Sequence, residues 1–366
     1  MSLQFITGNS GNGKTKYLFN TIVKEAKAHP RDNYLVIVPE QFTMQTQRQL
    51  VDLSENKAIM NIDVLSFKRL AYRVFDELGI TNLTVLEETG KNLVLRKLAA
   101  QEADKLGVIG RNLNRIGYIS EVKSLLSELV QYNISPEELG RYIDSGSLSD
   151  TLSGKLKDVL VLYEAFEKFM QDKYITAEEI LNVLCNVADE SAILRNSVIA
   201  FDEFTGFTPN QYKVLRTIFN KAKEVNISLT VDNPHLLTYS KSDAFSRTKD
   251  TYAKIVKLCN EEGIKLLPSV DLNKDVLPRF KNSKELQHLE KYYNSYPYKI
   301  YEEKTNNIFI KEFNNLYSEV EQVAKEIVNL VRDKGVRYRD ITVATRDLNK
   351  YDFLVKSIFN EYKIPN

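Results

Sequence analysis

The sequence contains few of the residues that build disulfide frameworks or metal centres. Its 366 residues include 2 cysteines, 3 histidines and no tryptophan. Cys185 and Cys259 lie far apart without ligand-like spacing, which argues against a disulfide framework or a zinc site. No apolar stretch approaches the length of a membrane span, and no signal peptide precedes the first expected strand. We therefore expect a cytoplasmic protein that does not associate with a membrane.

An excess of charge of one sign is also missing. The formal net charge is +1, so no global field draws the chain to nucleic acid, and any such binding needs a local patch of cations. The hydrophobic share of 43% and the charged share of 27% are ordinary for a soluble protein. The length allows roughly two or three domains with a sizeable core.

What the sequence does contain is a glycine-rich stretch, "GNSGNGKT", directly after the apolar run Leu3–Thr7. Glycine backbones adopt conformations closed to other residues, and the free N–H groups of such a loop form a nest for phosphate at the start of a helix. Lys14 can reach the β- and γ-phosphates, and the Thr15 hydroxyl can ligate Mg²⁺. The alternative, a glycine turn before a helix, is weaker in this strand-loop-helix setting. The predicted nucleotide-binding residues are Gly8, Asn9, Ser10, Gly11, Asn12, Gly13, Lys14 and Thr15.

Strand and helix signals alternate at the start of the chain, which is typical of a doubly wound parallel sheet. The expected strands are Leu3–Thr7, Tyr34–Val38 and Ile59–Leu65, and the expected helices are Lys14–Ala28, Gln41–Leu53 and Ser66–Leu78. Helix-period segments then follow one another and indicate an inserted all-α subdomain. They are Glu87–Ala103, Asn114–Tyr132, Ser135–Ile143, Gly154–Gln171 and Thr176–Val187.

Strands return after the helical stretch, at Ser197–Phe201 and Val225–Val231. Between them, Thr208 and Pro209 form a good helix start, with the helix running to about Lys221. A charged, irregular region near 271–304 precedes a second strand-helix-strand pattern. Its parts are Ile308–Phe313, Leu316–Lys334 and Ile341–Ala344. Because the chain stops before another strand completes this unit, we expect a truncated second domain.

A phosphate loop needs a carboxylate at the end of a neighbouring strand, and "VIAFDEF" supplies one. Asp202 is predicted to hold Mg²⁺ through water, and Glu203 to orient and deprotonate the attacking water. The alternative is a strand followed by a solvated acidic turn. The phosphate loop earlier in the chain favours the catalytic interpretation.

Several stretches resemble motifs of UvrD-type superfamily 1 DNA helicases. "DEFTGFTPNQ" (202–211) resembles their Walker B stretch, "IDVLSFKRLAYRVFDELG" (62–79) resembles a strand-Ser-Phe-helix element, and "YRDITVATR" (338–346) resembles motif IV. The resemblance implies a P-loop NTPase with a first RecA-like domain (1–85 and 190–270), a helical insertion (86–189) and the start of a second RecA-like domain (300–366). It also assigns Gln211 to the nucleotide site and a γ-phosphate contact to Arg346.

The same resemblance implies a path for single-stranded DNA. "VIVPEQFTMQTQRQL" stands where motif Ia belongs, and we expect motif Ia and the turn at 66–67 to share one exposed surface because they follow neighbouring strands. Further candidates for phosphate contact or base stacking are Arg111, Arg115, Tyr239 and Phe245. The main DNA-binding candidates are Gln41, Phe42, Thr43, Ser66, Phe67, Lys68 and Arg69.

Within that superfamily the sequence is most similar to the AddB family, the B subunits of AddAB helicase–nucleases. The similar stretches are "GNSGNGKT", "VPEQFT", "VLSFKRLAYRV", "FDEFTGFTPNQ" and "LTVD" followed by "SRTKDTY". This similarity implies use of ATP and Mg²⁺, a heterodimer with AddA, binding of single-stranded DNA and double-strand ends, and break processing for recombination with a response to Chi. The family's nuclease and its cysteine-held iron–sulfur cluster belong to a C-terminal part outside this chain.

Departures from working helicases limit the implied activity. The Gln motif of working helicases precedes the first strand, and nothing stands there in this sequence. Motif III reads Gly-Asp and then Gln, but Val231-Asp232 and His235 stand at these positions. Residues 205–207 read Thr-Gly-Phe in place of Gln-Asp-Thr. We therefore expect a helicase-like subunit that binds nucleotide and DNA without being an autonomous motor. An autonomous superfamily 1 helicase and a P-loop small-molecule kinase are the alternatives. The Asp-Glu pair and the large distance from Lys14 to Asp202 along the chain argue against the kinase.

Overall fold

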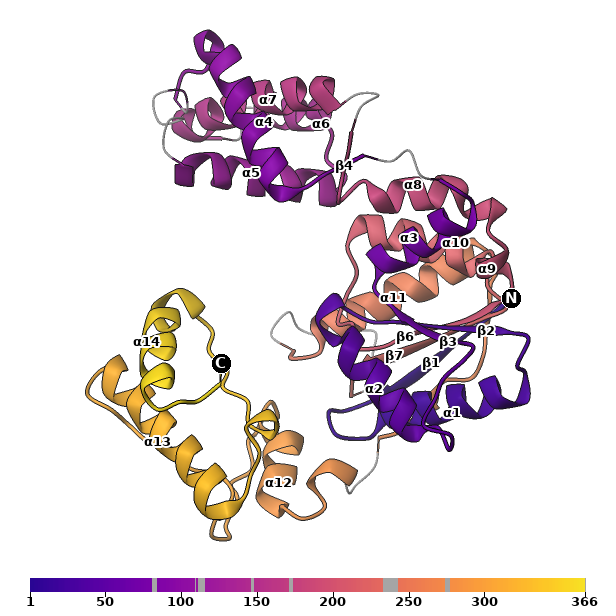
Figure 1. Ribbon diagram of the computed structural model, residues 1–366, viewed down its shortest axis with the longest axis vertical. Coiled ribbons are helices and arrows are strands. Elements are labelled where there is room, and N and C mark those ends of the chain that lie inside the picture. Colours follow the sequence, from indigo (N-terminus) through magenta and orange to yellow (C-terminus); the bar gives the residue numbers. More distant parts are fainter. Residues whose placement is uncertain are drawn as a thin grey trace. The chain divides into compact units, whose positions relative to one another are not determined.

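A parallel β-sheet organises the N-terminal part of the chain (Figure 1) in the computed structural model, which describes residues 1–80, 84–108, 110, 116–145, 148–170, 174–232, 243–273 and 277–365. The strand order is β3-β2-β6-β7-β1-β8, with β9 also paired to β1, and each described pairing in this sheet is parallel. The fold is therefore α/β. The strands are β1 (Ser2–Gly8), β2 (Asn33–Ile37), β3 (Ile62–Leu65), β6 (Ser197–Phe201), β7 (Glu224–Thr230), β8 (Lys265–Leu266) and β9 (Val270–Asp271).

The strand order decides which loops meet. β7 lies between β1 and β6. Its residue Ile227 is opposite Phe5 of β1 on one side and opposite Phe201 of β6 on the other. β2 and β3 are neighbours beyond β6. Because parallel strands end at the same edge, the residues that follow β1, β6 and β7 gather at one edge of the sheet, where ligands of such sheets bind.

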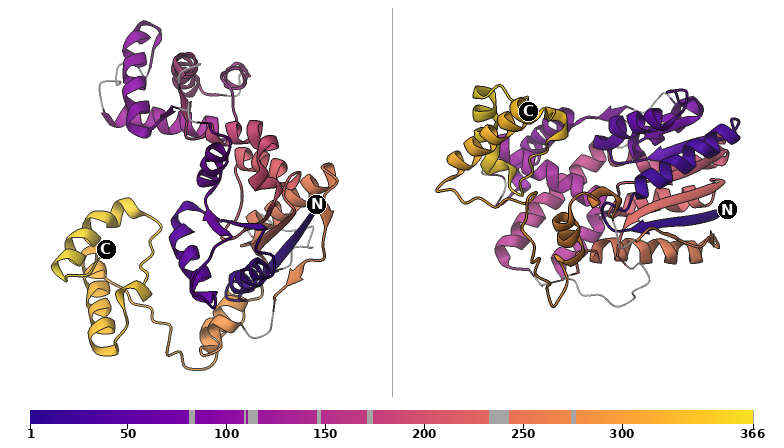
Figure 2. Two further views of the ribbon diagram at one scale, coloured as in Figure 1. Left: turned by 45° about the vertical axis from the view of Figure 1, so that its right-hand side comes forward. Right: turned by 90° about the horizontal axis from the view of Figure 1, so that it is seen from below.

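Helices cover both faces of the sheet (Figures 1 and 2) because the strands carry apolar residues on both sides. Phe5 faces one layer, and Ile6, the next residue in β1, faces the other. The first layer contains α3 (Phe67–Glu77), α10 (Pro209–Phe219) and α11 (Ser246–Glu261), and the second contains α1 (Lys14–Ala28) and α2 (Thr43–Leu53).

Four further helices form a layer with a hydrophobic core of their own, which includes Leu95, Leu126 and Leu162. A short parallel pair of strands, β4 (Val85–Leu86) and β5 (Ile175–Thr176), leads into and out of this layer. The helices are α4 (Glu88–Gln101), α5 (Ile116–Gln131), α6 (Pro136–Asp144) and α7 (Asp150–Met170).

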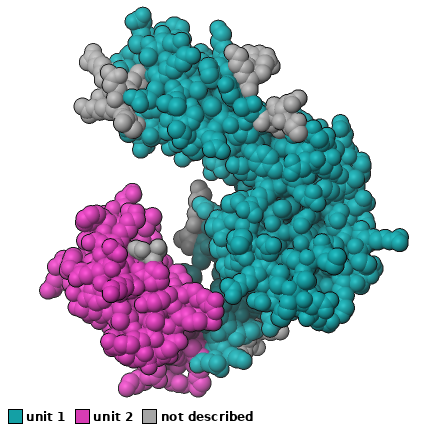
Figure 3. Space-filling model, viewed as in Figure 1, with its two compact units in different colours: residues 1–282, 290–298 teal, residues 283–289, 299–366 magenta. Residues whose placement is uncertain are grey.

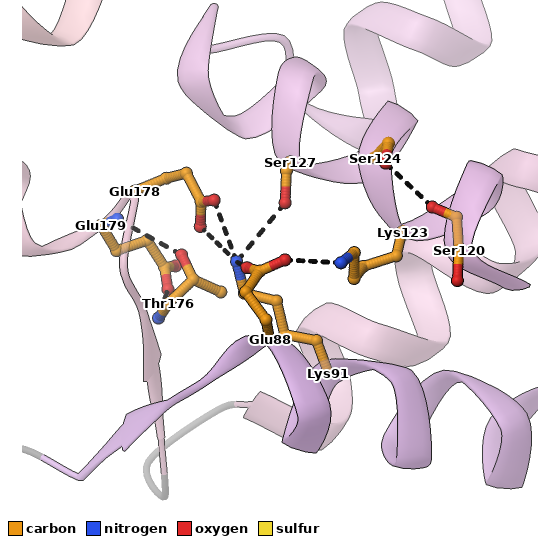
Figure 4. A network of polar contacts seen from close by, with 9 residues as sticks. All are labelled: Glu88, Lys91, Ser120, Lys123, Ser124, Ser127, Thr176, Glu178 and Glu179. Atoms are coloured by element: carbon orange, nitrogen blue, oxygen red, sulfur yellow. Dashed lines mark hydrogen bonds and ion pairs between the residues drawn. The ribbon is translucent and has the colours of Figure 1, made fainter. Parts of the chain in front are cut away.

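A buried lysine ties the helical layer to the chain that leaves it (Figure 4). The Nζ atom of Lys91 lies 2.7 Å from Glu178 Oε2 and 3.1 Å from Glu88 Oε1, and the Lys91 side chain is 3% exposed. Lys123 pairs with the other oxygen of Glu88. Removing one partner of such a buried ion pair leaves an uncompensated charge, so loss of Glu178 would weaken the attachment of α4 to the turn before α8 (Ile180–Val187).

The helix expected at Thr176–Val187 begins later and packs elsewhere than predicted. Thr176 pairs in β5, and its hydroxyl accepts a hydrogen bond from the Glu179 N–H at 3.2 Å. Helix α8 therefore runs only from Ile180 to Val187. Its buried Ile180 and Leu184 belong to the core beside the sheet, not to the core of the helical layer.

The chain divides into two compact units, residues 1–282 with 290–298 and residues 283–289 with 299–366 (Figure 3). In the second unit, α13 (Leu316–Lys334) and α14 (Leu348–Glu361) pack around Val320, Ala324 and Ile358. Helix α12 (Lys284–Tyr292) spans the division between the units. The predicted helix Leu316–Lys334 is confirmed at both ends.

The strands predicted at Ile308–Phe313 and Ile341–Ala344 are wrong. Both segments lack strand hydrogen bonding, and Phe309 and Ile310 are 76% and 95% exposed. A strand exists only when a partner satisfies its backbone groups, and none of the described residues pairs with these two segments. Within the same described ranges, the structure contains no helix long and apolar enough to cross a bilayer.

Candidate functional site

The phosphate loop connects β1 to α1, as the sequence predicts. Gly11 and Gly13 adopt positive φ angles of 87° and 86°, and Gly13 is the N-cap of α1. Among the described residues no side chain caps this helix N-terminus, and no acid lies in its first turn, so its N–H groups and dipole favour an anion. A Cβ atom at Gly11 would lie 3.1 Å from both Arg279 and Phe280, so the loop and a later segment approach closely here.

Lys14 lies over the loop with its side chain largely buried. Its Nζ atom donates to the Asn9 carbonyl oxygen at 3.0 Å, and the residue is 9% exposed. Burial lowers the pKa of Lys14, and the negative charges of Asp202 and Glu203 partly offset this effect. A cation held beside the loop in this way can transfer its hydrogen bond from the carbonyl to a bound phosphate.

Asp202 follows β6 and is 2% exposed. Its Oδ1 atom accepts a hydrogen bond from the hydroxyl of Ser228, on β7, and the Thr15 hydroxyl lies near the carboxylate. Burial raises the pKa of Asp202, while these two hydroxyls lower it. The Oδ2 atom has no hydrogen-bond partner in the described part of the chain. A buried carboxylate oxygen without a partner, next to a hydroxyl, suits a hard cation such as Mg²⁺.

Glu203 combines a strained backbone with a position at the cavity. Its φ angle is +63°, a left-handed conformation that costs energy for a residue with a side chain. Desolvation raises the pKa of Glu203, the negative charge of Asp202 raises it further, and Lys14 lowers it. A raised pKa and a strained backbone are both typical of residues at functional sites.

These groups line one cavity of about 560 Å³, within the range of small-molecule sites. Helix α2 contributes Gln45, Gln49 and Asp52 to the wall opposite the sheet edge. The other lining residues are Ser10, Gly11, Gly13, Lys14, Thr15, Lys16, Phe19, Leu53, Asp202, Glu203, Phe204, Thr205, Ser228, Thr230 and Arg279.

Ser228 and Arg279 are among the lining residues that the sequence analysis did not identify. Ser228 is a polar residue inside a buried parallel strand, "VNISLTV", and that contrast was the available signal. Arg279 lies in a short 3₁₀ turn (Pro278–Phe280), and its backbone N–H donates to the Gly11 carbonyl oxygen at 3.3 Å. The surrounding sequence has no periodicity, so nothing local pointed to Arg279.

Four of the predicted nucleotide-site residues do not line this cavity: Gly8, Asn9, Asn12 and Gln211. Gln211 lies in the first turn of α10, where its Oε1 accepts from the Thr208 N–H at 2.9 Å in a capping box. It lines a different cleft. Arg346 belongs to the second unit, where it is exposed, and its predicted γ-phosphate contact stays a prediction.

That second cleft has a volume of about 800 Å³ and contains most of the predicted DNA-binding residues. Lys68 and Arg69 are exposed at its edge. The Arg69 Nε atom lies 3.0 Å from Glu40 Oε1, and the Lys68 Nζ atom lies 6.0 Å from the centre of the Tyr72 ring. The lining residues are Val38, Pro39, Glu40, Ser66, Phe67, Lys68, Arg69, Tyr72, Gln131, Ala177, Glu178, Leu181, Phe204, Thr208, Asn210 and Gln211.

The prediction that residues 41–43 share one exposed surface with Lys68 and Arg69 is wrong for Phe42 and Thr43. Thr43 is 4% exposed, and its hydroxyl donates to the Glu40 carbonyl oxygen at 2.9 Å. Phe42 is partly buried and packs against the core beneath α1 and α2. Gln41 is exposed.

The turn at 66–67 is also less accessible than a DNA contact requires. Ser66 is the N-cap of α3 and accepts from the Arg69 N–H, and Phe67 packs in a cluster of aromatic rings. Phe245 packs against the hydrophobic core that contains Phe67. Arg111, Arg115, His235 and Tyr239 lie outside the described residues.

Comparison with known proteins identifies one family. The family described as ADDB, N-terminal matches residues 5–290. A relative from Clostridioides difficile (strain 630), named as the B subunit of an ATP-dependent helicase/deoxyribonuclease, is 50% identical over 370 residues. That match covers 100% of this chain and 32% of the relative.

Further relatives carry the same name. That of Lachnoclostridium phytofermentans is 38% identical over 97% of this chain and 31% of its own length. That of Clostridium tetani (strain Massachusetts / E88) is 37% identical over 100% of this chain and 32% of its own length. This chain therefore spans about a third of the length of the curated relatives it matches.

Proposed function

The chain belongs to the family described as ADDB, N-terminal, and from that premise we propose that it binds nucleotide and DNA as part of the B subunit of an ATP-dependent helicase/deoxyribonuclease. The observation that carries the proposal is the single cavity shared by the phosphate loop, Thr15 and Asp202. Titration with a labelled ATP analogue and Mg²⁺ tests it. Saturable binding at one site per chain supports the proposal, and the absence of saturable binding contradicts it.

The fold-level part of the proposal is a P-loop NTPase arrangement. Residues 1–85 with 190–270 form a first RecA-like domain, 86–189 a helical insertion and 300–366 the start of a second RecA-like domain. The strand order supports the first assignment, because one strand, β7, separates the phosphate-loop strand β1 from the acidic strand β6. The separate hydrophobic core of α4–α7 supports the second.

In the nucleotide site, the triphosphate of ATP lies in the loop of residues 8–15, against the open N-terminus of α1. Lys14 moves its hydrogen bond from the Asn9 carbonyl to the phosphates. Thr15 and Asp202 would hold Mg²⁺, and the Asp202 Oδ2 atom, which has no hydrogen-bond partner among the described residues, supports this assignment. The cation neutralises charge on the phosphates when it is bound. Ser228 keeps the Asp202 carboxylate oriented through its hydroxyl.

For hydrolysis, Glu203 is the candidate general base and two arginines are candidates to stabilise charge. Arg279 lines the cavity. Arg346 belongs to the second unit, and its role rests on the resemblance of 338–346 to motif IV. Because that arginine can act only if the second unit closes on the nucleotide, we expect slow turnover of this chain alone.

The DNA part of the proposal uses the second cleft. Lys68 and Arg69 contact backbone phosphates of single-stranded DNA, and exposed Gln41 lies beside them on the neighbouring connection. We also propose a heterodimer with AddA, engagement of double-strand ends, and a role in break processing for recombination with a response to Chi. The names of the relatives support a multi-subunit, ATP-dependent enzyme that acts on DNA.

Replacing both Lys68 and Arg69 by alanine is expected to weaken single-strand binding about tenfold at low salt. Each lost phosphate contact lowers the slope of log affinity against log salt by about 0.7, so the slope should fall by about 1.4. Phosphate contacts carry no sequence information, so all DNA sequences should be affected by a similar factor. Fluorescence anisotropy over a salt series measures both quantities.

A matched control removes two exposed lysines from α1, Lys24 and Lys27, on the opposite face of the sheet. This variant has the same net charge as the double alanine variant at Lys68 and Arg69. It should bind DNA with the affinity of the wild type. If both variants bind alike, the DNA path lies elsewhere.

A further inference from the structure

The segment that follows β9 crosses the phosphate loop at two points. At the first, the Leu272 N–H donates to the Thr7 carbonyl oxygen at 2.9 Å, and Asn273 reaches the start of the loop. At the second, the Arg279 N–H donates to the Gly11 carbonyl oxygen. The described parts of residues 271–280 therefore form a wall along the loop.

The Asn273 side chain makes four hydrogen bonds, which is the full capacity of an amide group. Its Oδ1 atom accepts from the Asn9 backbone N–H at 2.9 Å and from Asn12 Nδ2 at 3.0 Å. Its Nδ2 atom donates to the Asp232 carbonyl oxygen at 2.9 Å and to Asp271 Oδ1 at 2.8 Å. One end of the amide thus binds the phosphate loop, and the other binds residues at the ends of β7 and β9.

Asp232, whose carbonyl oxygen binds Asn273, is held in turn by an ion pair. Asp232 follows β7, and its Oδ1 atom lies 2.9 Å from Lys249 Nζ on α11. The Lys249 side chain is 1% exposed and also pairs with Asp243 at 2.7 Å. Because buried Lys249 pairs with both carboxylates, it holds the residue that follows β7, Asp232, in place, although the Asp232 side chain is itself 44% exposed.

The contacts of Asn9 connect this network to Lys14. The Asn9 carbonyl oxygen accepts from Lys14 Nζ and from the Asn12 N–H, while its own N–H donates to Asn273. Asn273 therefore holds the backbone N–H of Asn9, the residue whose carbonyl oxygen accepts the hydrogen bond from Lys14. A loop containing three glycines would otherwise sample many conformations.

We propose that Asn273 is a positioning residue for nucleotide binding, which holds the phosphate loop in its receptive conformation before nucleotide arrives. The proposal rests on the proposed nucleotide binding at this loop. Fixing a binding loop in advance lowers the entropic cost of binding. The gain is lost when the amide is removed, because the loop N–H and the Asn12 amide then lose their acceptor.

The variant Asn273→Ala is expected to bind a labelled ATP analogue with Mg²⁺ about tenfold more weakly than the wild type. Without nucleotide, the backbone N–H of Asn9 should exchange with solvent deuterium at least about tenfold faster. The second readout does not depend on any ligand. Asn273→Asp keeps an acceptor for the Asn9 N–H, so it should restore slow exchange at Asn9.

Asn61→Ala is the matched control. Asn61 Nδ2 donates to the carbonyl oxygens of Ala26, His29 and Asp32, at the end of the sheet opposite the phosphate loop. This variant should lower the melting temperature, yet bind the analogue like the wild type and leave exchange at Asn9 unchanged.

The outcomes separate this proposal from the proposed function. If Lys14→Ala weakens binding while Asn273→Ala binds like the wild type, the positioning role is overturned and nucleotide binding stands. Rapid Asn9 exchange in the wild type, or equal exchange rates in the Ala and Asp variants, also overturns the positioning role. If the wild type and Lys14→Ala bind the analogue equally, nucleotide binding at this loop fails, and the positioning role fails with it.

Discussion

The chain alone is expected to hydrolyse ATP at least about a thousandfold more slowly than motor helicases, because an arginine supplied to the γ-phosphate is worth that much or more in related NTPases. The arginine assigned this role by resemblance, Arg346, is exposed on the second unit. Arg279 already lines the cavity before nucleotide binds. We expect Arg279 to stabilise the bound ground state and the transition state equally. Such a contact strengthens nucleotide binding but leaves the turnover rate unchanged.

DNA is also expected not to stimulate this ATPase. Gln211, the residue that resemblance assigned to the nucleotide site, uses its side chain to cap α10 and lines the cleft that contains Lys68 and Arg69. A coupled phosphate-release assay with and without single-stranded DNA measures both rates, with Glu203→Gln as the background control. Turnover near that of motor helicases, abolished by Glu203→Gln, would contradict this expectation.

Replacing Lys14 by alanine is expected to weaken binding of a Mg²⁺–ATP analogue about a hundredfold. Charge-assisted hydrogen bonds contribute up to about 3 kcal/mol each, and about 1.4 kcal/mol corresponds to a factor of ten. Within the described residues the hydrogen-bond partner of Lys14 Nζ is a neutral carbonyl oxygen, so a hydrogen bond from Lys14 to charged phosphates is stronger than the one it replaces. Fluorescence titration of wild type and variant gives the ratio directly.

The control for this variant is Lys24→Ala, which removes an exposed lysine from the same helix, α1, ten positions further along the chain. It changes the net charge equally and should bind the analogue like the wild type. Equal affinities of all three proteins would mean that the phosphate loop does not contact the phosphates.

The strand, loop and helix around residues 8–15 were predictable because their signals are local. The apolar run before Gly8, the glycine spacing and the helix-forming residues after Lys14 together require a strand, a loop and a helix. The capping of α10 was equally local, since Thr208 and Gln211 have the spacing of a capping box. That spacing competes with the nucleotide role that resemblance gave Gln211, and the capping role is the one present in the structure.

The remaining features depend on contacts between distant parts of the chain. Arg279 and Asn273 reach the loop from a stretch without periodicity, across more than 250 residues of sequence. Resemblance placed Thr43 and Phe67 in DNA-binding motifs, but a motif gives a position along the chain, not the direction of a side chain. The apolar stretches at 308–313 and 341–344 have strand composition, but whether a strand forms depends on a partner elsewhere in the sequence.

The central claim is that the cavity at the ends of β1 and β6 binds Mg²⁺ and nucleotide together. A crystal structure of the chain with Mg²⁺ and a non-hydrolysable ATP analogue tests it most directly. We predict phosphates within the loop of residues 8–15, Lys14 turned from the Asn9 carbonyl to the phosphates, and Mg²⁺ in contact with the Thr15 hydroxyl and held directly or through water by Asp202. Nucleotide bound elsewhere, or a loop that stays empty at saturating analogue, would contradict this claim.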